Sequence, residues 1–191
     1  MRVIAGKAKG HKLKTIEGLQ TRPTTDRMKE TLFNVIAFDL LQCRFLDLFS
    51  GSGAIGIEAL SRGAKECVFV EKSKEACHII DENLKHTKLK NAVVLQKDVF
   101  DALLLLKQQK FDMIFLDPPY QSDLAVSVCH KIVEYDLLEK QGYVIWERSA
   151  EIKIPFISGL TIVKEKKSKT TVITFLTLEE EYDKSNLCRE F

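Results

Sequence analysis

The stretch RFLDLFSGSGAIG, at residues 44–56, decides the fold of this chain. A short apolar strand runs into a G-x-G-x-x-G turn made by Gly51, Gly53 and Gly56, and a segment of helical period follows it. Glycines at these positions let the backbone turn sharply and approach a ligand, while the start of the next helix offers free N–H groups. The pattern predicts a nucleoside-binding loop at the end of a parallel strand.

Apolar runs alternate with segments of helical period through most of the chain, which predicts βαβ units and a mostly parallel, twisted, doubly wound sheet of the α/β class. Strands are expected at 45–49, 67–70, 92–95, 111–116 and 143–146. Helices are expected at 54–62, 73–86, 99–107 and 121–138. The runs 160–164 and 171–176 lie too close together for a crossover helix, so they predict a C-terminal antiparallel hairpin that closes the sheet.

A small hairpin and a helix are predicted ahead of the glycine turn. Residues 2–5 and 12–16 flank a glycine-bounded connection at 6–10, which indicates a basic N-terminal β-hairpin. Residues 23–26 form a helix-start signal. A helix of about four turns is expected after it, because apolar residues recur at helical spacing at Met28, Leu32, Ile36 and Leu40.

The chain has 191 residues, of which 45% are hydrophobic and 29% charged. These values suit a single domain, with residues 1–20 as the hairpin extension, 21–178 as the core and 179–191 as an acidic tail. No apolar run approaches the roughly 20 residues that a bilayer requires, and the N-terminus lacks a signal-peptide core, so we expect a cytoplasmic protein that binds no membrane. The five cysteines and four histidines lack disulfide or metal-ligand spacing, so we expect no metal. We also expect a monomer.

Positive charge is concentrated at the N-terminus. Residues 1–30 contain eight Lys or Arg and three acids, a net charge of +5, whereas the rest of the chain has a net charge of −3. This distribution suits a polyanionic partner, although a solvated basic face explains it equally well.

Two acids follow the second and third strands. Glu71 stands twenty residues after Gly51, where its carboxylate can accept hydrogen bonds from both hydroxyls of a ribose. Loop and acid together leave NAD and S-adenosylmethionine as candidate cofactors. Asp98 ends the third strand at the same edge, where it either holds an adenine amino group or caps the helix that begins at Val99.

The fourth strand runs into the tetrapeptide Asp117-Pro118-Pro119-Tyr120. In a doubly wound sheet this strand lies beside the first, so the tetrapeptide should border the glycine loop. The prolines lack N–H groups, so the turn presents acceptors that suit an NH2 group, and the tyrosine ring adds a stacking surface for a base. A Pro-Pro turn that merely closes a strand is the simpler alternative.

With these residues in view, the chain resembles S-adenosylmethionine-dependent methyltransferases of exocyclic amines, whose signature is Asp/Asn/Ser-Pro-Pro-aromatic. Residues 1–6, 22–27, 47–53 and 117–120 together resemble the RsmD family of 16S rRNA guanine-N2 methyltransferases, and the resemblance extends to about residue 176. It implies a Rossmann-like methyltransferase fold with S-adenosylmethionine as the cofactor. It also implies ribosomal RNA as the partner, within the 30S subunit or its assembly intermediate.

The resemblance also assigns roles to individual residues. For the cofactor it implies Asp47, Ser50, Gly51, Gly53, Gly56, Glu71, Lys72, Asp98, Val99 and Asp117. For the target guanine and catalysis it implies Asp117, Pro118, Pro119 and Tyr120. RNA contacts are expected at Arg2, Lys7, Lys9, Lys12, Arg22, Thr24 and Arg27. One departure is the loop at 166–170, where members usually carry a Tyr-Gly pair and this chain has Lys-Lys-Ser-Lys-Thr.

Three other functions fit parts of the sequence. An adenine-N6 methyltransferase that acts on DNA shares the tetrapeptide. A dehydrogenase is disfavoured, because no Lys, Tyr or His stands at a recognisable acid–base position. A non-catalytic RNA-binding module would explain the basic N-terminus but would leave the glycine loop, Glu71 and the tetrapeptide without a role.

Overall fold

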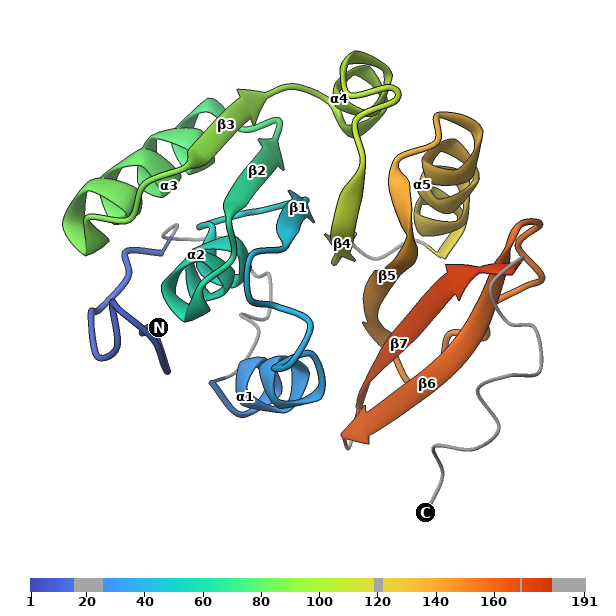
Figure 1. The fold of residues 1–191 in the computed structure, drawn as a ribbon, viewed down its shortest axis with the longest axis horizontal. Helices are drawn as coiled ribbons and strands as arrows, with labels where there is room; N and C mark the ends of the chain where they lie inside the picture. Colours follow the sequence, from blue (N-terminus) through green and yellow to red (C-terminus); the bar gives the residue numbers. More distant parts are fainter. Residues whose placement is uncertain (16–25, 119–121, 169, 180–191) are drawn as a thin grey trace.

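The computed structural model of the chain describes residues 1–15, 26–118, 122–168 and 170–179. Its sheet has seven strands in the order β3-β2-β1-β4-β5-β7-β6 (Figure 1). The strands are β1 Arg44–Leu48, β2 Glu66–Glu71, β3 Ala92–Gln96, β4 Phe111–Leu116, β5 Leu138–Ser149, β6 Leu160–Ser168 and β7 Thr171–Leu178. The helices are α1 Asp26–Val35, α2 Ala54–Arg62, α3 Lys74–Thr87, α4 Val99–Leu105 and α5 Ser122–Glu134.

The sheet topology confirms the predicted α/β fold. Strands β1 to β5 are mutually parallel, and β7 pairs antiparallel with both β5 and β6. Strand β4 lies directly beside β1, with Leu116 opposite Leu48. The residues that follow these two strands therefore meet at the same edge of the sheet, as the sequence predicts.

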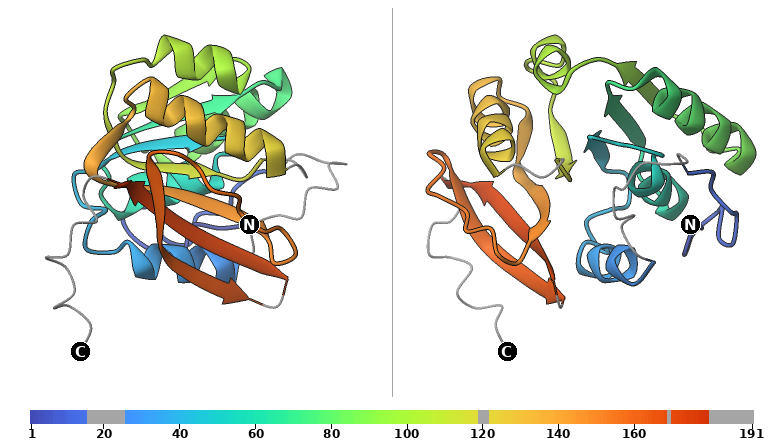
Figure 2. Two further views of the ribbon diagram at one scale, coloured as in Figure 1. Left: turned by 90° about the vertical axis from the view of Figure 1, so that its right-hand side faces the viewer. Right: turned by 180° about the vertical axis from the view of Figure 1, so that it is seen from behind.

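Helices cover both faces of the sheet (Figure 2). Phe45 and Phe69 face a core that α1, α2 and α3 complete, whereas the alternate residues Leu46 and Val68 face a core that includes α4 and α5. This two-sided burial explains why the strand sequences are almost continuously apolar.

Four elements differ from the sequence prediction. Helix α1 ends at Val35, although Ile36 and Leu40 are buried as the stripe predicts; apolar spacing reports burial and not the backbone conformation. Helix α5 ends at Glu134, and β5 begins at Leu138 rather than at 143, because a register shift against β4 places a polar stretch inside the strand. Residues 166–168 belong to β6 and not to a loop, since an edge strand accommodates lysines on its open side.

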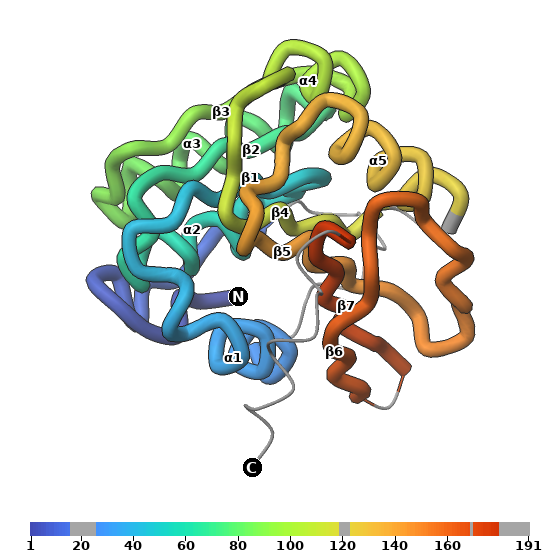
Figure 3. The backbone as a smooth tube through the Cα atoms, turned by 45° about the vertical axis from the view of Figure 1, so that its right-hand side comes forward, coloured from blue at the N-terminus to red at the C-terminus, as the bar shows by residue number. Residues whose placement is uncertain are grey.

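The predicted N-terminal hairpin is present but short. It consists of one antiparallel bridge between Arg2 and Lys12, with hydrogen bonds from Val3 N to His11 O and from Gly10 N to Val3 O. The segment lies against α2 (Figure 3). Three of its apolar residues are buried there, namely Val3, Ala8 and Leu13. The remainder of the second predicted strand, from residue 16, lies outside the described residues.

Two further observations concern disulfides and membrane-spanning helices. The cysteines at 43, 67, 77 and 129 are buried and form no disulfide. Among the described segments, no helix combines the length and the apolar character that crossing a membrane requires.

Candidate functional site

The glycine loop joins β1 to α2 in the geometry that its sequence demands. Gly51 and Gly53 have φ values of 53° and 77°, a region in which residues with a Cβ are strained. A Cβ built on Gly51 would meet no atom within 4 Å, so the space beside this residue is open. Gly53 caps the start of α2, where backbone N–H groups are directed outward. The loop therefore leaves open space for a ligand beside the half-buried Gly51.

Ser50 fixes the loop to the two strands beneath it. Its hydroxyl donates to Asp47 O at 2.6 Å and accepts from Val70 N at 3.1 Å, and its backbone N–H donates to Val70 O at 3.0 Å. Ser50 is buried, so it positions the loop from within the protein.

Glu71 lies beside the glycine loop, where the sequence places it. One carboxylate oxygen accepts from Gly51 N at 3.0 Å, and the other accepts from Ser73 N at 2.9 Å. The side chain is half-buried at the end of β2. These contacts orient the carboxylate at the rim of the open space beside Gly51.

Asp47 and Gly56 support the loop from beneath. Asp47 is 1% exposed and accepts from Gly56 N at 2.9 Å. Burial, together with the smaller effects of the carboxylates of Asp117 and Glu71, raises the pKa of its carboxyl to about 7 against the opposing effect of that hydrogen bond. A Cβ on Gly56 would lie 2.3 Å from the Phe69 ring, which confirms that this glycine permits close helix–strand packing.

The other predicted cofactor residues lie at the same sheet edge. Lys72 is exposed immediately after Glu71. Asp98 is exposed and caps α4, accepting from Phe100 N at 3.0 Å, so the capping interpretation is realised in this structure. The side chain of Val99 is buried in the core beneath α4.

Asp117 and Pro118 follow β4, next to the end of β1. Asp117 is open to solvent, yet nearby protein atoms desolvate its carboxylate and raise its pKa. Pro119 and Tyr120 lie outside the described residues.

Three carboxylates thus surround the start of the glycine loop. The negative charges of Glu71 and Asp117 both help to raise the pKa of Asp47. The charges of Glu71 and Asp117 favour a cation in the open space beside Gly51, whereas Asp47 is buried beneath the loop. The sulfonium and ammonium groups of S-adenosylmethionine fit this charge, and its ribose fits the Glu71 carboxylate.

The predicted RNA-binding residues divide into two groups. Arg2, Lys7, Lys9 and Lys12 are exposed on the N-terminal segment, and Arg27 is exposed on α1, whereas Arg22 and Thr24 lie outside the described residues. Lys29 also counts toward the predicted basic segment, but it is 0% exposed. It donates to Arg2 O and pairs with Glu58, so it adds no positive charge to the surface.

Glu58 and Ser61 of α2 were not found by sequence reasoning, yet they hold the N-terminal segment in place. The buried Glu58 carboxylate accepts from Ile4 N at 2.8 Å and from Ala5 N at 3.0 Å. The Ser61 hydroxyl accepts from Ala8 N at 2.9 Å and donates to Ala5 O at 2.6 Å. The basic N-terminal segment is therefore held against α2, the helix that begins directly after the glycine loop.

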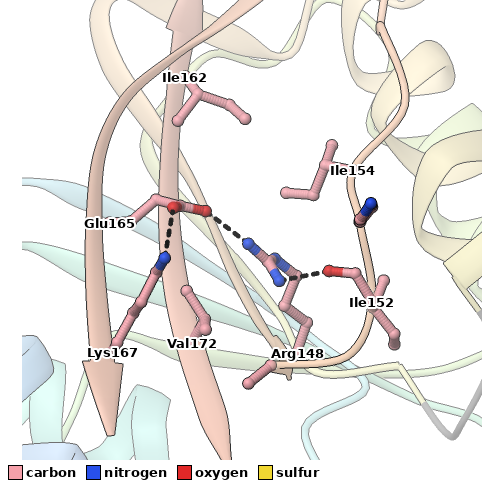
Figure 4. Close-up of a pocket in the computed structure, with 9 residues that line it drawn as sticks. Arg148, Ile152, Ile154, Ile162, Glu165, Lys167 and Val172 are labelled. Carbon is pink, nitrogen blue, oxygen red and sulfur yellow. Dashed lines mark hydrogen bonds and ion pairs between the residues drawn. The ribbon is translucent and has the colours of Figure 1, made fainter.

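A separate hollow of about 420 Å³ lies beside β6 and β7 (Figure 4). Arg148 crosses it and donates to the Glu165 carboxylate, to Ile152 O and to the Thr174 hydroxyl. These bonds hold the chain that follows β5 against the hairpin. None of the predicted site residues lines this hollow.

Comparisons with known proteins match nearly the whole chain. The family described as conserved hypothetical protein 95 matches residues 1–177. YlbH of Bacillus subtilis, named as a candidate rRNA methyltransferase, is 41% identical over 171 residues, which cover 88% of this chain and 93% of YlbH. Ribosomal RNA small subunit methyltransferase D of Haemophilus influenzae is 36% identical over 169 residues, covering 87% of this chain and 88% of that protein. A solved structure of yhhF from Escherichia coli, described as a candidate methyltransferase, matches with a TM-score of 0.84 and 27% identity, covering 94% of this chain and 98% of that chain.

Proposed function

Because this chain belongs to the conserved hypothetical protein 95 family, which is the RsmD family, we propose that it methylates the exocyclic N2 amine of a guanine in 16S ribosomal RNA. The methyltransferase fold and S-adenosylmethionine as cofactor, both predicted from the sequence, agree with these relatives. The observation that carries the proposal is the juxtaposition of the Glu71–Gly51 contact with the end of β4, where Asp117 follows the strand beside β1.

The glycine loop and its acids would hold the cofactor. Glu71 would bind the ribose hydroxyls, Gly51 and Gly53 would let the backbone approach the ligand, and Asp98 would accept from the adenine amine. Lys72 and Val99 would flank the same edge. When bound, S-adenosylmethionine supplies a methyl group on a positively charged sulfur. Asp47, Ser50 and Gly56 would act indirectly, because they are buried and fix the loop.

Asp117 and Pro118 would hold the target amine. The lone pair of a guanine N2 is delocalised into the ring, so the amine is a weak nucleophile. Hydrogen bonds from its two N–H groups to the Asp117 carboxylate and the Pro118 carbonyl favour a more tetrahedral nitrogen and stabilise the positive charge that develops on it. Pro119 and Tyr120 would complete this pocket, with the tyrosine ring stacked on the base.

Methylation replaces one N–H bond of the amine by an N–C bond, so one proton must leave. The Asp117 carboxylate can accept this proton, and its raised pKa makes it a better base than an ordinary aspartate. Alignment of the amine with the methyl group supplies the rest of the rate enhancement.

The exposed basic residues would bind the RNA. Arg2, Lys7, Lys9 and Lys12 lie on one docked segment, where contacts to phosphates would weaken steeply as the salt concentration rises. Lys166 and Lys167 on β6 would add contacts at the β6 edge of the sheet. We expect the enzyme to act as a cytoplasmic monomer on the 30S subunit or its assembly intermediate.

The decisive test is to incubate the protein with a labelled methyl donor and 30S particles or 16S RNA that lack the modification. The product is digested to nucleosides and identified by mass. Label in N2-methylguanosine supports the proposal. Label in N6-methyladenosine, from RNA or from DNA offered in parallel, favours the adenine alternative, and binding of RNA without any cofactor affinity favours a non-catalytic RNA-binding module.

A further inference from the structure

Asn83 of α3 connects two segments that are far apart in the sequence. Its side chain is 1% exposed, and its Oδ1 accepts from Lys14 N at 2.8 Å. Its Nδ2 donates to Lys14 O and to Ser52 O, both at 3.0 Å. The partners are one N–H group and two carbonyls, so they fix the orientation of the amide. One buried side chain thus bonds the N-terminal segment and the glycine loop simultaneously.

An amide is well suited to this place, because it carries an acceptor and two donors on one rigid plane. All three of its partners are backbone groups, so the contact does not depend on the side chains of Lys14 and Ser52. An aliphatic residue at this position would leave buried backbone groups without partners, and a carboxylate would keep the acceptor but lose both donors.

Ser52 lies at the turn of the glycine loop. It lies between Gly51 and Gly53, whose positive φ values allow the loop its shape. On one side of the loop Gly51 is held by Glu71, and on the other Ser52 is held by Asn83. A change in the loop that follows cofactor binding would therefore act directly on Asn83.

The N-terminal segment is attached to the same unit at a second place. Glu58 and Ser61 bind it to α2, the helix that begins directly after Gly53. Residue Lys14 and the glycine loop are therefore joined both through α2 and through Asn83. This second, direct connection shortens the path between the loop and the exposed lysines of the segment.

We propose that Asn83 is a positioning residue that couples cofactor binding at the glycine loop to RNA binding by the N-terminal segment. This inference rests on the proposed function for its RNA partner. Coupling between two binding sites is reciprocal, so the cofactor must raise RNA affinity by the same factor by which RNA raises cofactor affinity.

The test measures four dissociation constants by titration: S-adenosylhomocysteine with and without a 16S RNA transcript, and the transcript with and without S-adenosylhomocysteine. In the native chain the coupling factor should be at least about fivefold in both directions. Asn83→Asp and Asn83→Ala should reduce it to about one, and should weaken S-adenosylhomocysteine binding about tenfold in the absence of RNA. A thermal unfolding curve for each variant ensures that only folded protein is compared.

Glu82→Gln is the matched control. Glu82 is the neighbour of Asn83 on α3 and also contacts Lys14, but only through an ion pair between the two side chains at 2.8 Å. This variant should keep both the coupling factor and the cofactor affinity. A residue that merely stabilises the fold would lower the unfolding temperature and leave the coupling factor unchanged.

The outcomes separate this inference from the proposed function. If the native chain couples the two ligands and a folded Asn83 variant couples them equally, the inference is overturned and the proposed function stands. If the native chain binds S-adenosylhomocysteine but neither the transcript nor 30S particles that lack the modification, the proposed RNA function fails, and the coupling role of Asn83 fails with it. If only the 30S particles bind, they replace the transcript in all four titrations. Unchanged cofactor affinity in both Asn83 variants would also overturn the role of Asn83 at the loop.

Discussion

Glu58→Gln should strongly destabilise the protein, because it removes the charge that balances a buried lysine. Glu58 and Lys29 are both 0% exposed and lie 3.5 Å apart. Glutamine keeps the shape of the side chain but leaves the Lys29 ammonium without its anion. It also weakens the pair with Arg62 and replaces one oxygen that accepts from Ile4 N or Ala5 N by an NH2 donor. Removing one partner of a buried ion pair costs about 3–5 kcal/mol. Burial already lowers the pKa of Lys29, so loss of its proton relieves part of this cost. We therefore expect a loss of about 3 kcal/mol in the free energy of unfolding.

The loss can be measured by urea unfolding at pH 7, with the fluorescence of the single, buried Trp146 as the probe. Glu66→Gln is the control, because its ion pair with Arg44 is partly exposed and should contribute less than about 1 kcal/mol. Adding Lys29→Met to Glu58→Gln should restore part of the stability by removing the buried unbalanced charge, while the loss at Arg62 and at the N–H groups of Ile4 and Ala5 remains. A loss below about 1 kcal/mol for Glu58→Gln, or no recovery in the double variant, would refute this reasoning.

Three further predictions test the loop and the basic segment. Gly56→Ala should lower the free energy of unfolding by about 1–3 kcal/mol, because its Cβ would lie 2.3 Å from the Phe69 ring. Phe69→Leu in the same chain should reduce that loss. Equal losses with Phe69 and with Leu at this position would contradict the packing account. The pKa of Asp47 is raised to about 7, so the folded state holds a proton that the unfolded state releases above about pH 4. The free energy of unfolding should therefore fall by up to about 4 kcal/mol as the pH rises from 4 to 7. Urea titrations across this range should give a flatter profile for Asp47→Asn. Parallel profiles for the native chain and this variant would count against the raised pKa. Replacing Lys7 and Lys9 by Ala should weaken RNA binding without changing cofactor affinity. The slope of the logarithm of the RNA-binding constant against the logarithm of the salt concentration should become less steep by about 2. An unaltered slope would show that this segment does not contact the RNA.

The arrangement of the sheet could be predicted because its signals are local. The glycine turn follows a strand, Glu71 ends the next one, and parallel strands bring their carboxyl ends to a common edge. The position of β4 beside β1 followed from the doubly wound topology alone. These rules placed Asp117 at the correct strand end without any information about side-chain contacts.

The support behind the site could not be predicted, because it depends on contacts between distant residues. Lys29 looks like any other residue of a basic segment, and only its contact with Glu58 makes it a core residue. Asn83 lies in an ordinary amphipathic helix, and its partners are backbone groups 31 and 69 residues away. A buried polar residue has no sequence pattern when its partners are backbone groups far along the chain.

Asp117→Ala gives the most direct test of the claim that the glycine loop and the tetrapeptide form a single active site. Methyl transfer to 16S RNA should fall by at least about 100-fold, because the acceptor for the target amine is lost. The dissociation constant for S-adenosylmethionine should rise much less than turnover falls, since Glu71 and the glycine loop remain even though one nearby carboxylate is lost. Equal losses of turnover and cofactor affinity would contradict the account, because they would make Asp117 a structural residue.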